Sequence, residues 1–389
     1  MRCPIRRVNL KKWKFPAGRR MLSFIITFSV LLFAGIVSSG AEPVNIPLCA
    51  SYEMWNAVGI SAAEKAMDLL RKQGVNPIVG NLIFMTTAGY AEINGLSTQG
   101  SIDGAASVTK AERGRHTLIE IHAAPWNSLW FAVYEKSSGY CAYIEADPEK
   151  ITEYCVKDAG ASYGLFFPGV VERIDAAYLY QHAEEYEAKF KKKMFGGNEF
   201  RIITIANAVS AGASSAAVRA FEFHDHYCPG VTSGILMATY IKKHFPPGKN
   251  GYFIHSVDPW CKEDALMVIL NATPGKKAYA VSYPSDADKA LRIPEAAGAS
   301  TVAYRKNDQG NIWEGAVLSF DWAETNCLKT GSGIIDKLCI DLWCLDHMDK
   351  PEAFVKEVKR FSMEKGASPM DWARPGTDPL TKLGLTVVK

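Results

Sequence analysis

The sequence lacks an excess of charge of either sign. It contains 44 Lys and Arg residues against 41 Asp and Glu residues, a formal net charge of +3. Much of this small excess lies within the first twenty residues, so the remainder is close to neutral. Because nucleic-acid binding depends on clustered positive charge, composition gives no support for a nucleic-acid partner.

Cysteine is too sparse for a disulfide scaffold. The chain has 9 cysteines, and Cys3 lies in a segment that we expect to be removed. The rest leave room for one or two bridges in an exported protein of this size. Cys327, Cys339, Cys344 and His347 lie close together, but they do not form the paired C-x-x-C spacing of a zinc ribbon. We expect a disulfide or buried thiols there.

The sequence has a single long apolar run, Leu22 to Val37. A basic stretch precedes it and the small residues Ser38 to Ala41 follow, which predicts an export signal over residues 1–41 and a periplasmic or other extracytoplasmic location. The alternative is an uncleaved N-terminal membrane anchor, although the run is slightly short for a span of about 20 residues. After signal removal we expect no membrane span.

Several segments recur in the same order, which predicts an α+β protein of two tandem units. The units are expected over residues 48–198 and 199–366, each with helices packed on a mostly antiparallel or mixed β-sheet, before a tail of residues 367–389. The recurring pairs are 102–115 with 263–276, 132–147 with 302–321, 62–70 with 216–223, and 183–193 with a predicted helix over 351–365.

The segment from His224 to Gly230 carries the strongest chemical signal. His224, His226 and Cys228 alternate, so in an extended segment they would share one face and could converge. Pro229 suits the first turn of a helix, which places Cys228 at a helix N-terminus, where a thiolate is stabilised. Imidazole and thiolate together predict a metal site, with zinc the best match. The alternatives are an uncoordinated catalytic Cys228 and a purely structural role.

Cys261 is the predicted fourth ligand, because it precedes a second helical run from Lys262 to Asn271. Asp264 follows one turn later, as a further ligand or as a partner for a histidine ring, and Asp225 is a second candidate partner. Trp260 is expected to wall the site and to exclude water.

A turn after this helical run is a weaker candidate for binding. Thr273, Gly275 and Lys276 offer a hydroxyl, a close backbone approach and a positive charge, so the turn could receive an anion. The alternative is an ordinary turn that ends the helix.

The first unit is expected to repeat the frame without the ligands. It has about Gln73, Val75 and Asn76 where the second unit has its two histidines and first cysteine, and about Gly100 opposite Cys261. This comparison predicts a degenerate copy that packs against or walls the second unit.

The motifs of the second unit resemble those of FmdE, a family of formylmethanofuran dehydrogenase proteins. The matching positions are His224, His226, Cys228, Pro229, Gly230 and Gly234, then Cys261, Asp264, Ala265, Thr273, Gly275 and Lys276. Asp225 departs from the glycine of the family motif, and Leu266-Met267 depart from its Ile-Gln. The resemblance implies an α+β core with a cleft that holds Cys and His residues, often with a bound metal.

Together these features predict an exported zinc-binding protein that acts as a metal carrier or as an accessory of a redox or cofactor system. The first alternative is a metal- or cysteine-dependent enzyme acting on a small molecule in the cleft. The second is a disulfide-stabilised interaction module. The expected partners are a transition-metal ion, a small-molecule ligand and a second copy of the chain.

Overall fold

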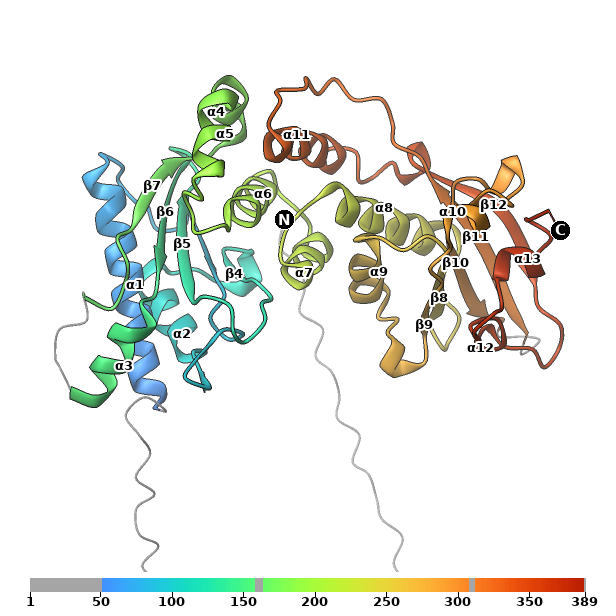
Figure 1. The fold of residues 1–389 in the computed structure, drawn as a ribbon, viewed down its shortest axis with the longest axis horizontal. Helices are drawn as coiled ribbons and strands as arrows, with labels where there is room; N and C mark the ends of the chain where they lie inside the picture. Colours follow the sequence, from blue (N-terminus) through green and yellow to red (C-terminus); the bar gives the residue numbers. More distant parts are fainter. Residues whose placement is uncertain (1–50, 158–163, 308–311, 388–389) are drawn as a thin grey trace, which may run out of the picture. The chain divides into compact units, whose positions relative to one another are not determined.

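The structure is a computed structural model that describes residues 51–157, 164–307 and 312–387. Over these ranges the chain forms 13 α-helices, two five-stranded mixed sheets and one two-stranded sheet (Figure 1). The protein is therefore α+β, as the sequence predicts. No helix within these ranges has both the length and the apolar character needed to cross a membrane. The predicted export signal, residues 1–41, lies outside the described residues.

The first half packs two helices against one face of a mixed sheet. Helix α1 (Tyr52–Lys72) lies beside helix α2 (Gly100–Thr109), and both share a buried core with the sheet. The strand order is β4-β1-β5-β6-β7, in which only β1 and β4 pair in parallel. The strands are β1 (Leu82–Thr86), β4 (Leu118–Glu120), β5 (Trp130–Glu135), β6 (Tyr140–Glu145) and β7 (Val170–Arg173), and the two-stranded sheet consists of β2 (Glu92–Ile93) and β3 (Leu96–Ser97).

The second half has the same kind of layer. Helix α8 (Pro229–His244) lies beside helix α9 (Lys262–Leu270) on a sheet of order β9-β8-β10-β11-β12. Strands β8 and β9 pair in parallel, and the others pair antiparallel. The strands are β8 (Tyr252–Ser256), β9 (Tyr279–Val281), β10 (Ala299–Lys306), β11 (Trp313–Phe320) and β12 (Val355–Ser362).

The two halves share the order and direction of their strands, which is consistent with two tandem units. Their helix pairs also cross at matching glycines. A Cβ atom on Gly59 of α1 would lie 2.0 Å from the carbonyl oxygen of Ser101 in α2, and one on Gly234 of α8 would lie 2.4 Å from that of Lys262 in α9. In both halves the helix backbones therefore approach too closely for any side chain larger than hydrogen.

The topology differs from the sequence comparison at two places. Helix α8 occupies the place of α1, so residues 62–70 do not correspond to 216–223, which lie in helix α7 (Ser215–His224). The predicted helix over 351–365 is also wrong, because residues 355–362 form strand β12. Apolar Val355, Val358 and Phe361 recur every third residue, as in a helix. A register shift between Val317 and Leu318 of β11 explains this spacing, because it leaves Val358 unpaired.

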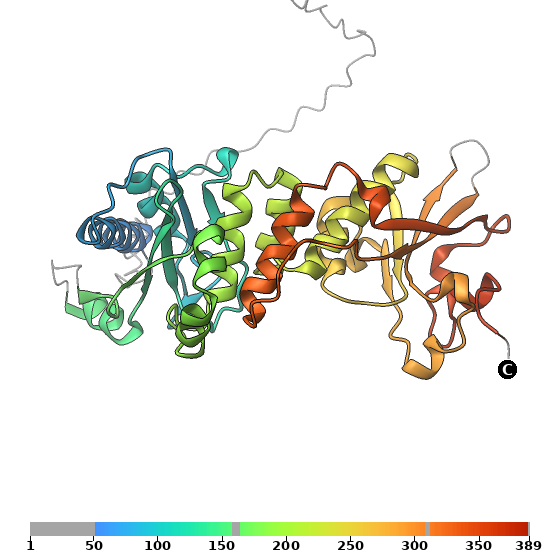
Figure 2. The same cartoon turned by 90° about the horizontal axis from the view of Figure 1, so that it is seen from above.

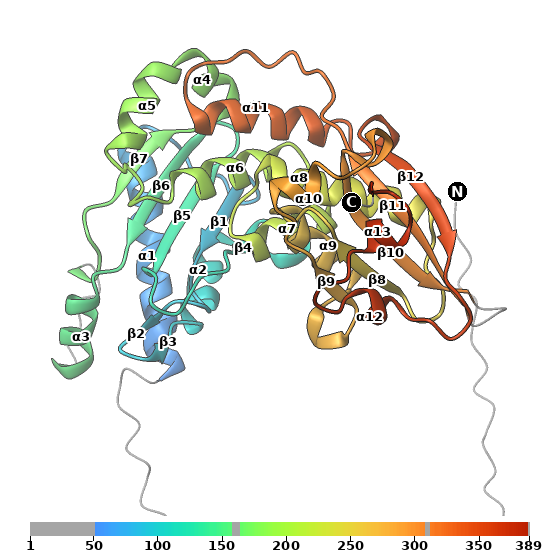
Figure 3. The same ribbon diagram turned by 45° about the vertical axis from the view of Figure 1, so that its right-hand side comes forward.

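Three further helices lie between the sheets. Helices α6 (Glu199–Ser210) and α7 pack with the second face of the first sheet in one core, which also includes residues of α8 and α9. Helix α11 (Gly333–Leu345) runs beside α6 and α8 (Figures 2 and 3). Residues 46–389 accordingly form one compact unit. The helices that cover the edge of the first sheet are α3 (Pro148–Lys157), α4 (Ala176–Gln181) and α5 (Ala183–Lys191).

The segment predicted as a C-terminal tail packs onto the outer face of the second sheet. Leu380 and Leu385 are buried there, in a core shared with β8, β10 and β11. The short helices in this layer are α10 (Asp286–Lys289), α12 (Pro369–Trp372) and α13 (Pro379–Lys382).

Candidate metal site

The residues from His224 to Cys228 form a tight turn between two helices and not the extended segment that the alternation predicts. His224 is the last residue of α7, and Asp225 follows in the left-handed conformation with φ 72°. Aspartate tolerates this conformation better than most residues do. Cys228 then takes an extended conformation as the N-cap of α8, with Pro229 in the first turn as predicted. The turn therefore brings His224 and Cys228 together from the ends of two different helices.

Cys261 reaches the same place from the N-terminus of α9. It is the N-cap residue of that helix and packs against Gly230 in the first turn of α8. A Cβ atom on Gly230 would lie 2.6 Å from the Cβ of Cys261, so only glycine allows this approach. Residues 33 positions apart in the chain thus meet at the crossing of α8 and α9.

Three of the four predicted ligands converge. Ligand atoms of His224, Cys228 and Cys261 all lie within 4.8 Å of one another. The Nδ1 atom of His224 donates a hydrogen bond of 2.6 Å to Asp264 Oδ2. Its Nε2 atom is buried and has no hydrogen-bond partner among the described residues. One nitrogen is therefore fixed by an outer carboxylate while the other is free to bind a metal, which is the usual arrangement of a ligating histidine.

His226 lies beside this group but outside it. Its ring centroid is 4.5 Å from that of His224, and its Nδ1 donates to the carboxylate of Asp225. Arg201 of α6 holds the second oxygen of that carboxylate at 2.8 Å. The ring also packs against Phe200, at 5.0 Å between centroids. Asp225 therefore orients His226, whereas Asp264 orients His224.

The two thiols share a proton unequally. A hydrogen bond from Cys228 and a second from His224 lower the pKa of Cys261 to about 4. The hydrogen bond to Cys261, together with burial, raises the pKa of Cys228. Although burial lowers the pKa of His224, the hydrogen bond to Asp264 and the neighbouring Cys261 raise it to about 9. Cys261 is therefore the thiolate of the pair, whereas the sequence pattern favours Cys228 as the nucleophile.

The turn considered for anion binding is remote from this group. Thr273 and Gly275 lie beyond the C-terminal end of α9, opposite to the end that carries Cys261. Lys276 donates a hydrogen bond to the side-chain oxygen of Asn271, and the turn forms a short 3-10 helix. The lysine thus has a local partner that closes the end of α9.

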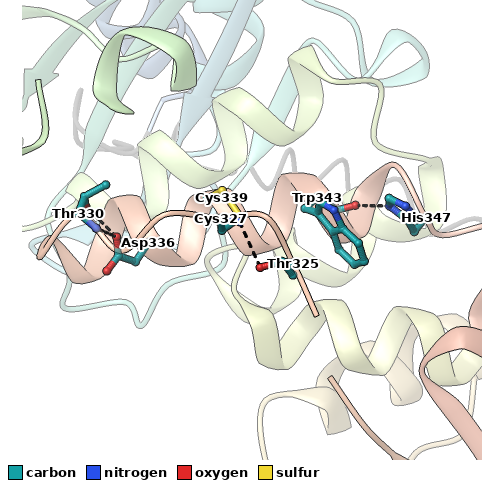
Figure 4. The surroundings of a disulfide bond; sticks show 7 residues. All are labelled: Thr325, Cys327, Thr330, Asp336, Cys339, Trp343 and His347. Atoms are coloured by element: carbon teal, nitrogen blue, oxygen red, sulfur yellow. Dashed lines mark hydrogen bonds between the residues drawn. A yellow bond between two sulfur atoms is a disulfide. The ribbon is translucent and has the colours of Figure 1, made fainter. Parts of the chain in front are cut away.

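The C-terminal cysteines contain both of the arrangements that the sequence left open. Cys327 and Cys339 form a disulfide, and Cys344 is a buried free thiol (Figure 4). The ring of His347 stacks on Trp343, and its Nδ1 donates to the carbonyl oxygen of Trp343 at 2.7 Å. Cys155 is also disulfide-bonded.

The residues that support the site include two that the sequence pattern does not reveal. Arg201 gives no signal, because it is an isolated cation on an amphipathic helix. Asp341 is fully buried in α11 and accepts a hydrogen bond of 2.7 Å from Thr232 of α8, and burial holds the pKa of its carboxyl well above the usual range. An acid within the apolar run of residues 334–345 is the signal that could have identified it.

The largest cavity lies elsewhere. A cavity of about 500 Å³ lies between residues 281–292 and the C-terminal segment, and no cysteine or histidine lines it. The side chain of Arg292, which lines it, donates to the carbonyl oxygens of Ala299 and Val257. Donor chemistry and not cavity size therefore marks the metal site.

The comparisons with known proteins agree with this location. No curated protein shows a significant match to the chain. Residues 223–310 match the family described as FmdE, Molybdenum formylmethanofuran dehydrogenase operon. The match runs from the last turn of α7 to just beyond β10 and includes all three convergent side chains. The second half of the chain thus carries an FmdE domain at residues 223–310.

Proposed function

We propose that this protein is an exported metal-binding protein that holds zinc through His224, Cys228 and Cys261 and serves as a metal carrier or an accessory of a redox or cofactor system. The observation that carries the proposal is the convergence of two sulfurs and one imidazole, with His224 Nε2 buried and without a partner. One nitrogen and two sulfur donors suit zinc, and other late first-row metals bind the same set. The FmdE domain supports an accessory role.

Exposure of the site supports exchange of the metal. Cys261 is only partly buried, and the Asp264 side chain is 32% exposed. A structural zinc site is usually closed by four protein ligands, whereas three ligands leave a position for an incoming group. A carrier needs such a position, because transfer proceeds through a shared ligand sphere.

The experiment is element analysis of the purified protein, followed by zinc titration against a competing chelator. We expect about one zinc per chain, and a loss of at least tenfold in affinity for Cys228→Ala and for Cys261→Ala. Cys141→Ala is the matched control, because Cys141 is a buried free thiol in β6 of the first half. Full zinc binding by both site variants would contradict the proposal.

The same three-donor arrangement favours a second candidate, a metal-dependent enzyme acting on a small molecule. A site with three protein ligands can hold a water that the metal acidifies. Cobalt-substituted protein distinguishes the two functions. An absorption spectrum that changes on addition of azide indicates an open position, and hydrolytic or redox activity that depends on the metal would then favour the enzyme.

Export is a separate part of the proposal, and it rests on residues 1–41. Fusion of this segment to a reporter that is active only outside the cytoplasm tests it. Retention of the reporter inside the cell would contradict export and leave the metal site unaffected.

A further inference from the structure

A second feature of the second half, an aromatic cleft, adjoins the metal site. Two cavities of about 360 Å³ and about 290 Å³ lie side by side and share Trp260 and Trp322 as walls. Trp260 directly precedes Cys261, and Pro229, which lines the smaller cavity, directly follows Cys228. Their combined size falls in the range of pockets for small molecules.

The tryptophans present large aromatic surfaces to solvent. Trp260 is 55% exposed and Trp322 is 43% exposed. Their rings meet edge to face, with centroids 6.4 Å apart, and Phe320 meets Trp322 in the same way at 4.9 Å. These contacts hold the rings at steep angles and prevent them from stacking on one another. The sequence predicts that Trp260 excludes water, but its exposure instead makes it a surface for a ligand.

A disulfide fixes one wall of the cleft. Ala323 and Thr325 follow β11 on one side, and Ile340 of α11 lies on the other. Cys327 and Cys339 join this loop to α11 within two residues of Thr325 and beside Ile340 (Figure 4). The wall is therefore preformed, which lowers the ordering cost of binding.

The charged residues of the cleft are already paired. The ammonium group of Lys262 is buried and contacts the carboxylate of Glu263 and the carbonyl oxygen of Asp258. The carboxylate of Asp258 pairs with Lys289 at 2.7 Å. The remaining polar side chains in the lining are the hydroxyls of Ser233 and Ser300. The cleft therefore offers aromatic faces and hydroxyl groups but no unpaired charge, which favours a neutral ligand.

We propose that the cleft binds a small, uncharged, planar ring compound, with its ring against Trp260 and Trp322 and a polar edge toward Ser233 and Ser300. The inference does not require the metal, and it goes beyond the function proposed above.

The test titrates the full chain, metal-free and zinc-loaded, with benzamide and with cyclohexanecarboxamide, which has the same amide on a saturated ring. Binding is followed through the indole N–H resonances of the tryptophans. We expect the Trp260 and Trp322 signals to shift with benzamide, and about tenfold weaker binding of the saturated compound. Trp260→Ala, Trp322→Ala and the double variant Cys327→Ser/Cys339→Ser should each weaken benzamide binding, the first two about tenfold.

Trp126→Ala is the matched control, because Trp126 is 85% exposed and lines neither cavity. Equal binding of the two compounds, equal losses in the Trp126 variant, or preferential binding of benzoate would each overturn the inference. Zinc affinity measured on the same samples separates the two proposals. Loss of ring binding with intact zinc binding bears only on the cleft, whereas loss of zinc binding with intact ring binding bears only on the metal site.

Discussion

At the scale of single residues, the metal site depends on how His224 is held. Its Nδ1 is bound to Asp264, so its Nε2 is the atom presented to Cys228 and Cys261. Such outer partners orient the ring and raise its basicity. A histidine that lost this partner would sample other ring orientations and bind metal less tightly.

Asp264→Ala should therefore lower zinc affinity by about 10- to 100-fold, measured by competition with a chelator. The matched control is Asp103→Ala, since Asp103 occupies the corresponding place in α2 of the first half and accepts a hydrogen bond from Tyr52. Equal affinities of the Asp264 variant and the unmodified protein would show that Asp264 does not support His224.

A second histidine, His255 in β8, controls how stability responds to pH. It is 1% exposed, and burial lowers its pKa to about 4 against the opposing charge of Asp378. Its Nε2 is 2.8 Å from Ser282 Oγ, and its Nδ1 has no partner among the described residues. Because the folded pKa lies below the unfolded value of about 6.5, the unfolded chain binds more protons between these values. The contribution of the neutral ring is thus present above pH 6.5 and is lost as the pH falls toward 4.

The expected loss from His255 over this range is roughly 3 kcal/mol, from the pKa difference. Urea unfolding of metal-free protein at pH 7.5 and at pH 4.5 measures it. His255→Gln should have a smaller difference in unfolding free energy between the two pH values than the unmodified chain. An unchanged difference would mean that other groups account for the pH dependence.

At the scale of elements, the crossing of α8 and α9 sets the separation of the two sulfurs. Gly230→Ala would place a methyl group against Cys261, in a core that has no room for it. We expect about 1–3 kcal/mol of destabilisation and at least tenfold weaker zinc binding, because α9 must shift. Gly275→Ala is the control, since no atom lies within 4 Å of the Cβ position and the residue is not in the left-handed region. Zinc binding by Gly230→Ala at the unmodified affinity would rule out this role of the crossing.

The sequence predicts the local parts of this crossing and not its geometry. Proline in the first turn and cysteine before it mark the start of α8, and the same logic places Cys261 at the start of α9. These signals are local, so they can be found in a single sequence. The left-handed Asp225 is not predicted, because the alternation places His224 in an extended segment, whereas α7 ends there. The approach of Trp322 to Trp260 depends on tertiary packing, which no periodicity encodes.

The same crossing in the first half suggests why that half has no ligands. There a Cβ atom on Gly100, at the start of α2, would lie 3.0 Å from the Cβ of Trp55. In the second half Cys261 stands at the start of α9 and packs against Gly230. We propose that the first half is a degenerate copy in which a tryptophan fills the space of the cysteine sulfur, so that the frame persists without the donor set.

At the scale of the whole molecule, the first half contacts the helix that carries His224. Arg113 contacts Glu222 of α7 through two hydrogen bonds of 2.5 and 3.2 Å, and the backbone N–H of Glu120 donates to the same carboxylate. The ring of His122 stacks on Phe223, at 5.4 Å between centroids. The last turn of α7 is thus held by β4 and by the loop that follows it. The first half, which supplies none of the three convergent donors, supports their position.

Arg113→Ala tests this support, because it leaves the carboxylate of Glu222 buried without its guanidinium partner. The Glu222 side chain is 9% exposed, and burial already raises its pKa despite the arginine. We expect a loss of roughly 2 kcal/mol of unfolding free energy and severalfold weaker zinc binding, with partial recovery in Arg113→Ala/Glu222→Gln. Arg115→Ala is the control, since Arg115 pairs with Glu112 at an exposed position, where an ion pair contributes about 0–1 kcal/mol. If Arg113→Ala lowered stability but left zinc affinity unchanged, the first half would stabilise the fold without positioning His224.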